Sequence, residues 1–254
     1  MKILTWNVNG LRAAQKKGFL PWLQRVRPDV LCLQEIKARP DQLDPALVEV
    51  PGYRAWFTPA KRPGYSGTAI YAREAPDEVW TGIGDARFDD EGRVTGARFG
   101  SLQVVSAYFP NSREGGSRLD FKLDFCRRIT RVLKNRIARG EDIVLAGDYN
   151  IAHEEIDLAR PDDNHESPGF FPAERRSMTQ FLKAGFLDVF REANPGLTGA
   201  YTWWSLRSAA RERNVGWRID YTNVNTGLRG RVRRSWILPD VKGSDHCPVG
   251  LELA

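Results

Sequence analysis

The sequence predicts an α/β protein in which strands and helices are mixed along the chain and stack in layers. Short apolar stretches, typical of buried strands, alternate with helical stretches from end to end. The second observation is that no low-complexity linker divides the 254 residues. A chain of this length fits one large domain or two small ones. Because nothing separates it into parts, we expect a single domain over residues 1–254.

The N-terminal part of the chain is expected to form a strand, a helix, a second strand and then hairpins. Residues 2–8 (KILTWNV) and 29–35 (DVLCLQE) are strand-like, and Leu11–Val26 carries a helical pattern that Pro21 interrupts. Hairpin-like alternation follows in four segments. These are YRAWFT (53–58), GTAIYAR (67–73), VTGARFG (94–100) and LQVVSAYF (102–109).

The C-terminal part begins with a long helix expected from about Ser117 to Ala138. Its apolar residues recur every four positions from Phe121 to Ile137, so most of the Arg and Lys between them are expected to face outward. A strand follows in DIVLAGDYN (142–150), and after a polar, proline-rich loop (161–172) a helix follows in AERRSMTQFLKAG (173–185). The last expected strands are WRIDYTNV (217–224), RVRRSWIL (231–238) and CPVGLEL (247–253).

Charge and cysteine content limit the class of protein. The 38 basic and 32 acidic side chains give a net charge of +6, which favours a polyanionic partner. No apolar run approaches the ~20 residues of a membrane helix, and residues 1–10 do not resemble a secretory signal. The three cysteines lie far apart at positions 32, 126 and 247 and fit neither a disulfide framework nor a zinc site. We therefore expect a protein of the reducing cytoplasm.

Polar residues able to do chemistry stand where the expected strands end. The first strand runs into WNVNG, the second into QE, the hairpins into AYFPN and the later strand into GDYN, while SDHCP precedes the last strand. Strand ends in layered α/β folds form the crevice where ligands bind. The residues expected to converge there are Asn7, Glu35, Tyr108, Asn111, Asp148, Asn150, Asp220, Asp245 and His246.

Each motif taken alone also has an ordinary structural explanation. NG at positions 9–10 is a strong turn signal, Glu35 could be a solvated strand end, and GDYN could be an Asx-turn in which Gly147 supplies an unusual backbone angle. SDHCP is harder to explain in this way, because an Asp–His pair before Pro248 serves no obvious turn type. His246 could be oriented by Asp220 or by Asp245.

The combination of these residues favours a metal site. Several carboxylates and one imidazole at adjacent strand ends would repel one another and be costly to desolvate unless a cation neutralises them. Oxygen ligands with few carboxylates suit Mg²⁺, which also binds through substrate phosphate, whereas zinc would require more Cys and His in one place. His153 and His165 lie in polar surroundings and receive no role, and Cys32, Trp6, Trp22 and Trp56 are expected in the core.

At this point the sequence resembles the exonuclease III and abasic (AP) endonuclease family, within the endonuclease/exonuclease/phosphatase superfamily. The resemblance covers nearly the whole chain. It is carried by WNVNGLRA, PDVLCLQEIK, GYSGTAIY, AYFPN, GDYNIAH, YTWWS, RERNVGWRIDY and SDHCPVGLEL. The superfamily shares only the Asn, Glu, Asp–Asn and Asp–His core, whereas NVGWRIDY with YTWW is typical of the abasic endonuclease branch. The resemblance implies a DNase I-like, four-layer α/β sandwich of two packed sheets flanked by helices.

The family resemblance also implies roles for residues at matching positions. Glu35 would bind the catalytic Mg²⁺, for which Mn²⁺ could substitute, with Asn7, Asp245, Asp148 and Asn150 close by. Asp148 and Asn150 would position and deprotonate the attacking water, and His246, oriented by Asp220, would contact the scissile phosphate. Tyr108 and Asn111 would hold the phosphate oxygens. Some family members have Asp at the position of Asn9.

The remaining implied contacts are with DNA. Trp203, Trp217 and Ile219 would wall a pocket for an extruded abasic sugar, and Tyr65 and Arg207 would also contact DNA. Phosphate contacts set affinity without reading sequence. The basic residues expected to grip the backbone are Lys61, Arg62, Arg207, Arg211, Arg213 and Arg218.

The leading hypothesis is a monomeric, Mg²⁺-dependent nuclease that cuts 5′ to abasic sites in duplex DNA, with 3′-end-cleaning and 3′→5′ exonuclease activity. A phosphatase acting on a small phosphoester or lipid headgroup is the alternative within the superfamily, and a non-catalytic nucleic-acid-binding module is the alternative outside it. The sequence leaves open the balance of exonuclease and endonuclease activity, the number of metals, and whether Asp148 or His246 is the general base.

Overall fold

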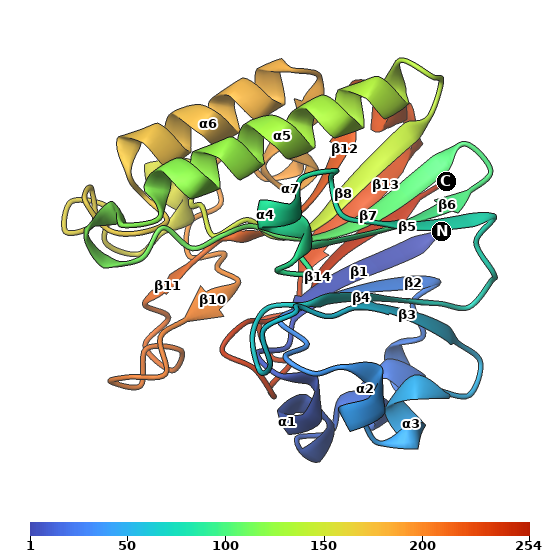
Figure 1. Cartoon of the computed structure of the whole chain (residues 1–254). Helices are drawn as coiled ribbons and strands as arrows, with labels where there is room; N and C mark the ends of the chain where they lie inside the picture. The colour runs from blue at the N-terminus through green and yellow to red at the C-terminus, as the bar shows by residue number, and fades with distance from the viewer.

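Two six-stranded sheets face each other, and helices cover the outer face of each (Figure 1). The structure is a computed structural model that describes residues 1–254. Three apolar clusters fill the spaces between the layers: one lies between the two sheets, and one lies between each sheet and its helices. The expected four-layer α/β sandwich of the DNase I type is confirmed.

The first sheet is built from both ends of the chain. Its strand order is β13-β14-β1-β2-β4-β3, with β1 parallel to β2 and antiparallel to β14. The amino group of Met1 donates to the carbonyl of Leu253 at 2.7 Å, so the two chain ends lie side by side. The strands are β1 (Lys2–Asn7), β2 (Val30–Gln34), β3 (Arg54–Thr58), β4 (Thr68–Ala72), β13 (Val232–Ile237) and β14 (Val249–Leu253).

The second sheet has the order β5-β6-β7-β8-β12-β9, with β7 parallel to β8 and β12 antiparallel to β8. Because β12 runs in the opposite direction, the start of β12 lies beside the end of β8, where Asp220 pairs with Asp148. The strands are β5 (Glu78–Thr81), β6 (Val94–Phe99), β7 (Leu102–Tyr108), β8 (Asp142–Asp148), β9 (Phe186–Leu187) and β12 (Asp220–Asn225).

Helices α1 (Leu11–Lys16), α2 (Phe19–Val26) and α3 (Pro45–Val48) cover the first sheet, and α5 (Leu119–Ile137) and α6 (Pro172–Lys183) cover the second (Figure 1). The other helices are short. They are α4 (Ala86–Asp89), α7 (Val189–Ala193) and four 3₁₀ turns at Pro40–Gln42, Glu114–Gly116, Glu155–Asp157 and Thr226–Arg231.

The helical pattern of residues 11–26 is interrupted at Gly18, and the prediction of an interruption at Pro21 was wrong. Gly18 has φ of 94° in the left-handed region, which separates α1 from α2. Pro21 lies in the first turn of α2, where a missing N–H costs no helical hydrogen bond. The long helix α5 buries Phe125, Ile129 and Leu133, as its periodicity predicts.

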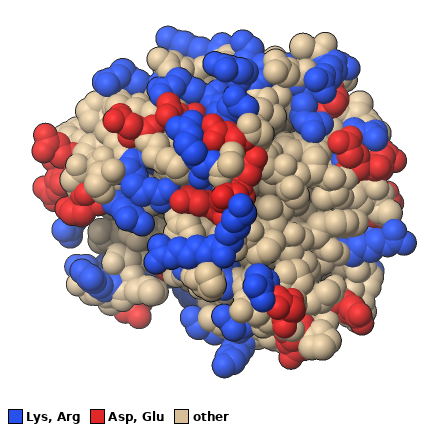
Figure 2. Space-filling model, in the orientation of Figure 1, with Lys and Arg blue, Asp and Glu red and all other residues tan.

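The outer face of α5 is basic, which confirms the amphipathic reading of this helix. Arg127, Arg131 and Lys134 are exposed there, opposite the apolar residues that pack on the second sheet. Figure 2 shows Lys and Arg gathered along the upper rim of the molecule, over α5. Part of the net positive charge is therefore solvated helix surface far from any strand end.

A polar chain of hydrogen bonds crosses between the two sheets near the strand ends. Thr5 donates to the Gln34 amide oxygen at 3.0 Å, and the Gln34 amide nitrogen donates to the Ser106 hydroxyl at 2.9 Å. All three side chains are fully buried. Farther from the strand ends the space between the sheets is apolar and contains Cys32, as expected. None of the three cysteines forms a disulfide.

The segment expected to be one strand at 217–224 is divided in two. Trp217 belongs to a short strand β11 (Gly216–Trp217), which pairs with β10 (Trp203–Trp204) in a separate ribbon, and β12 begins only at Asp220. Arg218 turns inward between them and is buried against Asp157 and Asp188. The single-strand prediction was wrong at this point, because two acidic partners from distant segments capture Arg218.

The other expected core tryptophans lie where predicted. Trp6 and Trp22 are buried under the first sheet, and Trp56 packs partly buried against the cluster between the sheets. No helix combines the length and the apolar character needed to span a membrane.

Candidate active site

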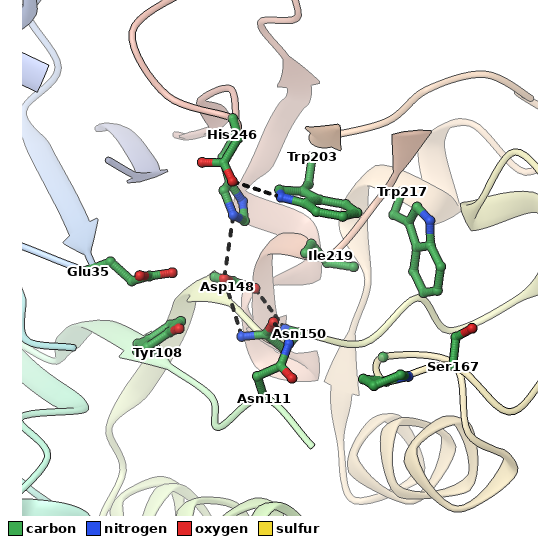
Figure 3. A pocket seen from close by; sticks show the side chains of 13 residues that line it. Glu35, Tyr108, Asn111, Asp148, Asn150, Ser167, Trp203, Trp217, Ile219 and His246 are labelled. Carbon is green, nitrogen blue, oxygen red and sulfur yellow. Dashed lines mark hydrogen bonds and ion pairs between the residues drawn. The ribbon is translucent and has the colours of Figure 1, made fainter. Parts of the chain in front are cut away.

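The ends of β1, β2, β7 and β8 and the starts of β12 and β14 meet at one edge of the sandwich. A cavity of about 230 Å³ opens there (Figure 3). Its walls contain seven of the nine residues that the strand ends were expected to bring together, and the other two, Asn7 and Asp220, lie behind the wall in hydrogen-bond contact with residues among those seven. The lining residues are Glu35, Tyr108, Asn111, Asp148, Asn150, Ser167, Pro168, Gly169, Trp203, Trp217, Ile219, Asp245 and His246.

Glu35 is held at the end of β2 by partners on either side of its carboxylate. The Asn7 amide donates to Oε1 at 2.9 Å, and the Lys37 ammonium lies 2.7 Å from Oε2. Burial alone would raise the pKa of Glu35, but Lys37 and Asn7 together outweigh it and hold this pKa below its usual value. The backbone of Glu35 has φ of 51°, a conformation costly for a non-glycine residue and common at functional sites.

Asp148 and Asn150 leave the end of β8 through a tight turn. The backbone N–H of Asn150 donates to Asp148 Oδ1 at 2.7 Å, which is the expected Asx-turn, and Asn150 itself has φ of 51°. Gly147 is required by close approach: a Cβ there would lie 1.9 Å from the carbonyl oxygen of Ala107 on β7. The turn thus serves the site, because it points the Asp148 carboxylate at Asn7, whose amide donates to it at 2.9 Å.

His246 is oriented by Asp220, and of the two candidate aspartates it is this one that contacts the ring. The ring Nδ1 lies 2.8 Å from Asp220 Oδ2, and the opposite nitrogen Nε2 lies 3.9 Å from Asp148 Oδ2. Burial lowers the pKa of His246, but the carboxylates of Asp220 and Asp148 outweigh it and raise the pKa to about 10. Burial and the neighbouring charge of Asp220 raise the pKa of Asp148 to about 7. Near neutral pH the His246 ring therefore keeps its proton, whereas Asp148 can gain or lose one.

Asn111 and Tyr108 complete the polar side of the cavity. The Asn111 amide donates to Asn150 Oδ1 at 3.0 Å (Figure 3). Burial, together with the charges of Glu35 and Asp148, raises the pKa of Tyr108 well above its usual value, so its phenol stays neutral and can donate a hydrogen bond. Together these residues offer neutral donors beside two carboxylates.

The opposite side of the cavity is apolar. Trp203 and Trp217 stand edge to face with ring centroids 6.3 Å apart, and Ile219 packs beside them in a small cluster with Leu158 and Phe170. The Trp203 indole N–H donates to Asp245 Oδ2 at 3.1 Å, which links the apolar side to the polar one. Neither Trp203 nor Trp217 is fully buried, and both face the opening (Figure 3).

Comparison with known proteins identifies the family. The model of the Endonuclease/Exonuclease/phosphatase family matches residues 4–246. An exodeoxyribonuclease of Bacillus subtilis is 42% identical over 99% of this chain and 98% of its own length. The DNA repair nuclease APEX1 of Danio rerio is 43% identical over 100% of this chain and 82% of its own. The chain belongs to this family, in its exodeoxyribonuclease and AP endonuclease branch.

Solved structures agree with this assignment. An AP endonuclease from Archaeoglobus fulgidus superposes with a TM-score of 0.89 at 29% identity. The match covers 100% of this chain and 99% of that protein. A 3′-5′ exonuclease from Neisseria meningitidis has a TM-score of 0.90 at 28% identity, again over 100% and 99%. The chain is therefore an enzyme of the family that the sequence resembles, and the resemblance is confirmed.

The donor atoms at the polar side fit a divalent cation of this nuclease family. One ligand atom from each of Glu35, Asp148 and His246 lies within 4.8 Å of the others. Mg²⁺ prefers oxygen ligands and usually binds through one or two carboxylates plus substrate phosphate, so Glu35 and Asp148 would be the ligands for it. The residues present therefore fit an ion of this kind.

Three of the five expected metal ligands make hydrogen bonds to other residues of the protein. The Asn7 amide nitrogen faces the carboxylates while its oxygen accepts from the N–H of Asn9, and Asn150 Oδ1 accepts from Asn111. Asp245 lines the cavity but stands outside the carboxylate cluster, because its oxygens accept from Asn9, Ser244 and Trp203. These residues hold the site in shape around Glu35 and Asp148.

Several expected DNA contacts lie outside the cavity. Arg218 is buried, so the expectation that it grips DNA was wrong. Arg211 stacks on Trp204 and donates to three backbone carbonyls, which commits it to holding the loop. The hydroxyl of Tyr65 contacts Arg93, Arg118 and Glu91, away from the opening. The remaining expected contacts, Lys61, Arg62, Arg207 and Arg213, are exposed.

The sequence analysis missed two parts of the site. Lys37 stands two positions after Glu35, and its ammonium bridges the Glu35 carboxylate and Asn9. Strand alternation could not have revealed this contact, because β2 ends at Gln34 and both Glu35 and Lys37 have positive φ, of 51° and 52°. Ser167, Pro168 and Gly169 form part of the apolar wall from within the proline-rich loop. Nothing in the local sequence distinguishes these three from ordinary loop residues.

Proposed function

We propose that this enzyme is a Mg²⁺-dependent DNA repair nuclease that hydrolyses the phosphodiester 5′ to abasic sites in duplex DNA. We also propose 3′-end-cleaning and 3′→5′ exonuclease activity, with Mn²⁺ as a substitute ion. The observation that carries the proposal is that one cavity joins the Glu35–Asp148–His246 cluster to the apolar wall of Trp203, Trp217 and Ile219. Relatives named as exodeoxyribonuclease and AP endonuclease support the same substrate class.

The proposed reaction forms a bond from a water oxygen to phosphorus and breaks the bond from phosphorus to the 3′ oxygen. It leaves a 3′ hydroxyl, which gains a proton, and a 5′ phosphate on the abasic fragment. Asp148 takes the proton of the attacking water, because a carboxylate with a pKa of about 7 is suited to that transfer at neutral pH. Asn150 and Asn111, which are hydrogen-bonded to each other, orient the water and the phosphate.

The other polar residues stabilise charge on the phosphate. With Asp220 on Nδ1, the protonated His246 ring presents its Nε2–H to a phosphate oxygen, and the neutral Tyr108 phenol donates to another. When bound, Mg²⁺ supplies further charge neutralisation, and Glu35 would hold it with Asp148 within reach. Asn7 keeps those two carboxylates together through its amide.

The apolar wall would select the lesion. Extruding an abasic sugar costs little because its base stacking is already lost. Trp203, Trp217 and Ile219 offer that sugar an apolar surface beside the reacting phosphate, while a nucleotide that keeps its base requires more room. The enzyme would act as a monomer and recognise damage without reading sequence.

The test is strand cleavage of a labelled duplex that carries one abasic analogue, with Mg²⁺ and with chelator, beside the undamaged duplex. The expected result is a single Mg²⁺-dependent cut 5′ to the lesion. An intact abasic duplex that the protein nevertheless binds would overturn the proposal. Turnover of a small phosphoester in that case would favour the phosphatase alternative.

A variant pair separates an enzyme from a non-catalytic binding module. Glu35→Gln removes a carboxylate from the cavity, and Glu49→Gln removes one from an exposed position outside it. In an enzyme, Glu35→Gln lowers turnover by orders of magnitude while DNA binding stays the same or tightens, and Glu49→Gln changes neither. A binding module would show only tighter binding for Glu35→Gln.

A further inference from the structure

A fully buried ion pair lies behind the cavity, between the two helices of the second sheet. Lys122 on α5 and Glu174 on α6 are both 0% exposed, and the Lys122 ammonium lies 2.6 Å from Glu174 Oε1. Burying two charges costs desolvation energy that well-packed apolar residues would avoid. The helices already meet through apolar side chains such as Phe125, Met178 and Phe181, so packing alone does not account for the pair.

The lysine of this pair holds the backbone of a proposed catalytic residue. Lys122 Nζ donates to the carbonyl oxygen of Asn150. Asn150 has φ of 51°, in the left-handed region that few non-glycine residues adopt and that asparagine adopts more readily than most. The Asn150 side chain in turn contacts Asn111 and Asp148. A fixed Asn150 carbonyl therefore fixes the direction of an amide at the reacting centre.

The glutamate of this pair joins two further segments of the cavity wall to the same lysine. Glu174 Oε2 accepts from the N–H of Gly169 at 2.8 Å and of Phe171 at 3.0 Å. Glu174 Oε1 accepts from the hydroxyl of Ser112, the residue after Asn111. Gly169 and Asn111 both line the cavity. One carboxylate thus ties the segment at 111–112 to the loop at 167–171.

We propose that Lys122 and Glu174 are positioning residues that set the geometry of Asn150, Asn111 and the Ser167–Gly169 wall as one unit. The inference rests on the proposed function, because the reaction is what the unit would align. Neither residue touches the cavity, so each acts through others. A displacement of about 1 Å in an active site can cost about 100-fold in rate, so loss of the pair should slow the chemical step.

The test uses the double variant Lys122→Met/Glu174→Gln, which removes both charges and leaves none unpaired. Its glutamine oxygen can still accept from Gly169 and Phe171, and its amide can donate to Ser112, while the Asn150 carbonyl loses its donor. On the abasic duplex with saturating Mg²⁺, we expect kcat to fall roughly 10- to 100-fold with KM within about threefold of wild type.

The control is Leu133→Ala, which removes a buried contact of the same helix α5 in the apolar cluster. It should lower the melting temperature and leave kcat unchanged.

The outcomes are distinguishable. A double variant with wild-type kcat overturns the inference and leaves the proposed function intact, and so does an equal loss of kcat in Leu133→Ala, which would reveal a stability effect. A wild-type protein that leaves the abasic duplex intact overturns both proposals together.

A measurement on the wild-type protein keeps the inference testable if the double variant does not fold. Backbone N–H groups of one rigid unit share an opening equilibrium. We expect amide hydrogen exchange at Asn150, Gly169 and Phe171 to show protection factors within about threefold of one another. A spread of about 100-fold would show that the segments open separately and would overturn the inference.

Discussion

The two sides of the cavity are supported in different ways. The carboxylate side, made of Glu35, Asp148 and His246, stands at the ends of strands in two six-stranded sheets. The tryptophan side, made of Trp203, Trp217 and Ile219, stands on a ribbon of two-residue strands and the loop after it. Long paired strands fix side chains through many hydrogen bonds, whereas a two-stranded ribbon is marginal by itself.

The ribbon obtains its rigidity from a buried charge cluster. Arg218 donates to Asp157 at 2.8 Å and to Asp188 at 2.7 Å, directly between Trp217 and Ile219. Arg191 reaches the same Asp157 at 2.6 Å. The carboxylate side thus depends on the pairing of strands in the two sheets, whereas the tryptophan side depends on buried side-chain ion pairs. The two sides can therefore be perturbed separately.

The largest expected effect is on the carboxylate side. His246→Ala removes the charged donor that the proposed mechanism places at the reacting phosphate, and loss of one such donor costs roughly 10²–10³ in kcat. Single-turnover cleavage of the abasic duplex measures the loss, and binding in chelator should change little. His153→Ala is the matched control, because that ring contacts Thr179 away from the cavity. Equal losses in the two variants would contradict the assigned role.

The second prediction concerns the anchor of the tryptophan side. Asp157→Asn weakens the pairing of the buried Arg218 and the partly buried Arg191, and breaking a buried pair costs about 3–5 kcal/mol of unfolding free energy. Burial raises the pKa of Asp157, but Arg218 and Arg191 outweigh it and hold the pKa below its usual value. A depressed pKa stabilises the fold above the unfolded pKa of about 3.9 and loses that contribution as pH falls further.

Urea unfolding of wild type and Asp157→Asn at a series of pH values checks how the contribution of Asp157 to the unfolding free energy depends on pH. The difference in unfolding free energy should be constant between pH 7 and pH 5, as both values exceed the unfolded pKa of about 3.9, and should narrow only below about pH 4. A difference that narrows between pH 7 and pH 5 would mean that another group controls it.

The third prediction tests whether the tryptophan side selects the lesion. Trp217→Ala enlarges the apolar side of the cavity, so the preference for abasic over undamaged duplex should fall by about 10-fold, the scale of apolar-pocket discrimination. The measurement is the ratio of kcat/KM for the two duplexes. Trp80→Ala is the control, because Trp80 lies on β5 and bonds Gln103. An unchanged ratio in Trp217→Ala would assign selection elsewhere.

The smallest expected effect is on DNA affinity. Arg207 is exposed in the loop after β10. If it contacts one phosphate, Arg207→Ala should lower the slope of log Kd against log salt by about 1 and leave kcat unchanged. Arg139→Ala is the control, an exposed arginine just beyond the end of α5. Equal slopes for all three proteins would remove Arg207 from the interface.

The sheets and the polar strand ends could be predicted because their signals are local. Apolar runs that stop at Glu35 and Asp148 mark both the strands and the site. The break before β12 could not be predicted, because it depends on Asp157 and Asp188 reaching Arg218 from other parts of the chain. For the same reason the sequence predicted that Arg218 contacts DNA, whereas in the structure it is buried and paired with Asp157 and Asp188.

The sequence predicted which residues gather at the cavity, but it did not predict most of the hydrogen bonds and backbone angles that hold them there. The backbone angle at Glu35 and the amide of Asn7 that joins two carboxylates exist only once β1, β2 and β8 are side by side. Lys122 and Glu174 looked like ordinary charges of amphipathic helices, since periodicity shows which face is apolar and does not show a charge buried within it.

The hydrogen bond from the Met1 amino group to the Leu253 carbonyl places the first and last residues of the chain next to each other. Strand β1 starts at Lys2 and ends at Asn7, so both chain ends lie at the edge of the sandwich away from the cavity (Figure 1). A short peptide joining the two ends would preserve every strand pairing, and new ends could be opened in a surface loop. The order of the strands along the chain could thus change while their order within the two sheets stays the same.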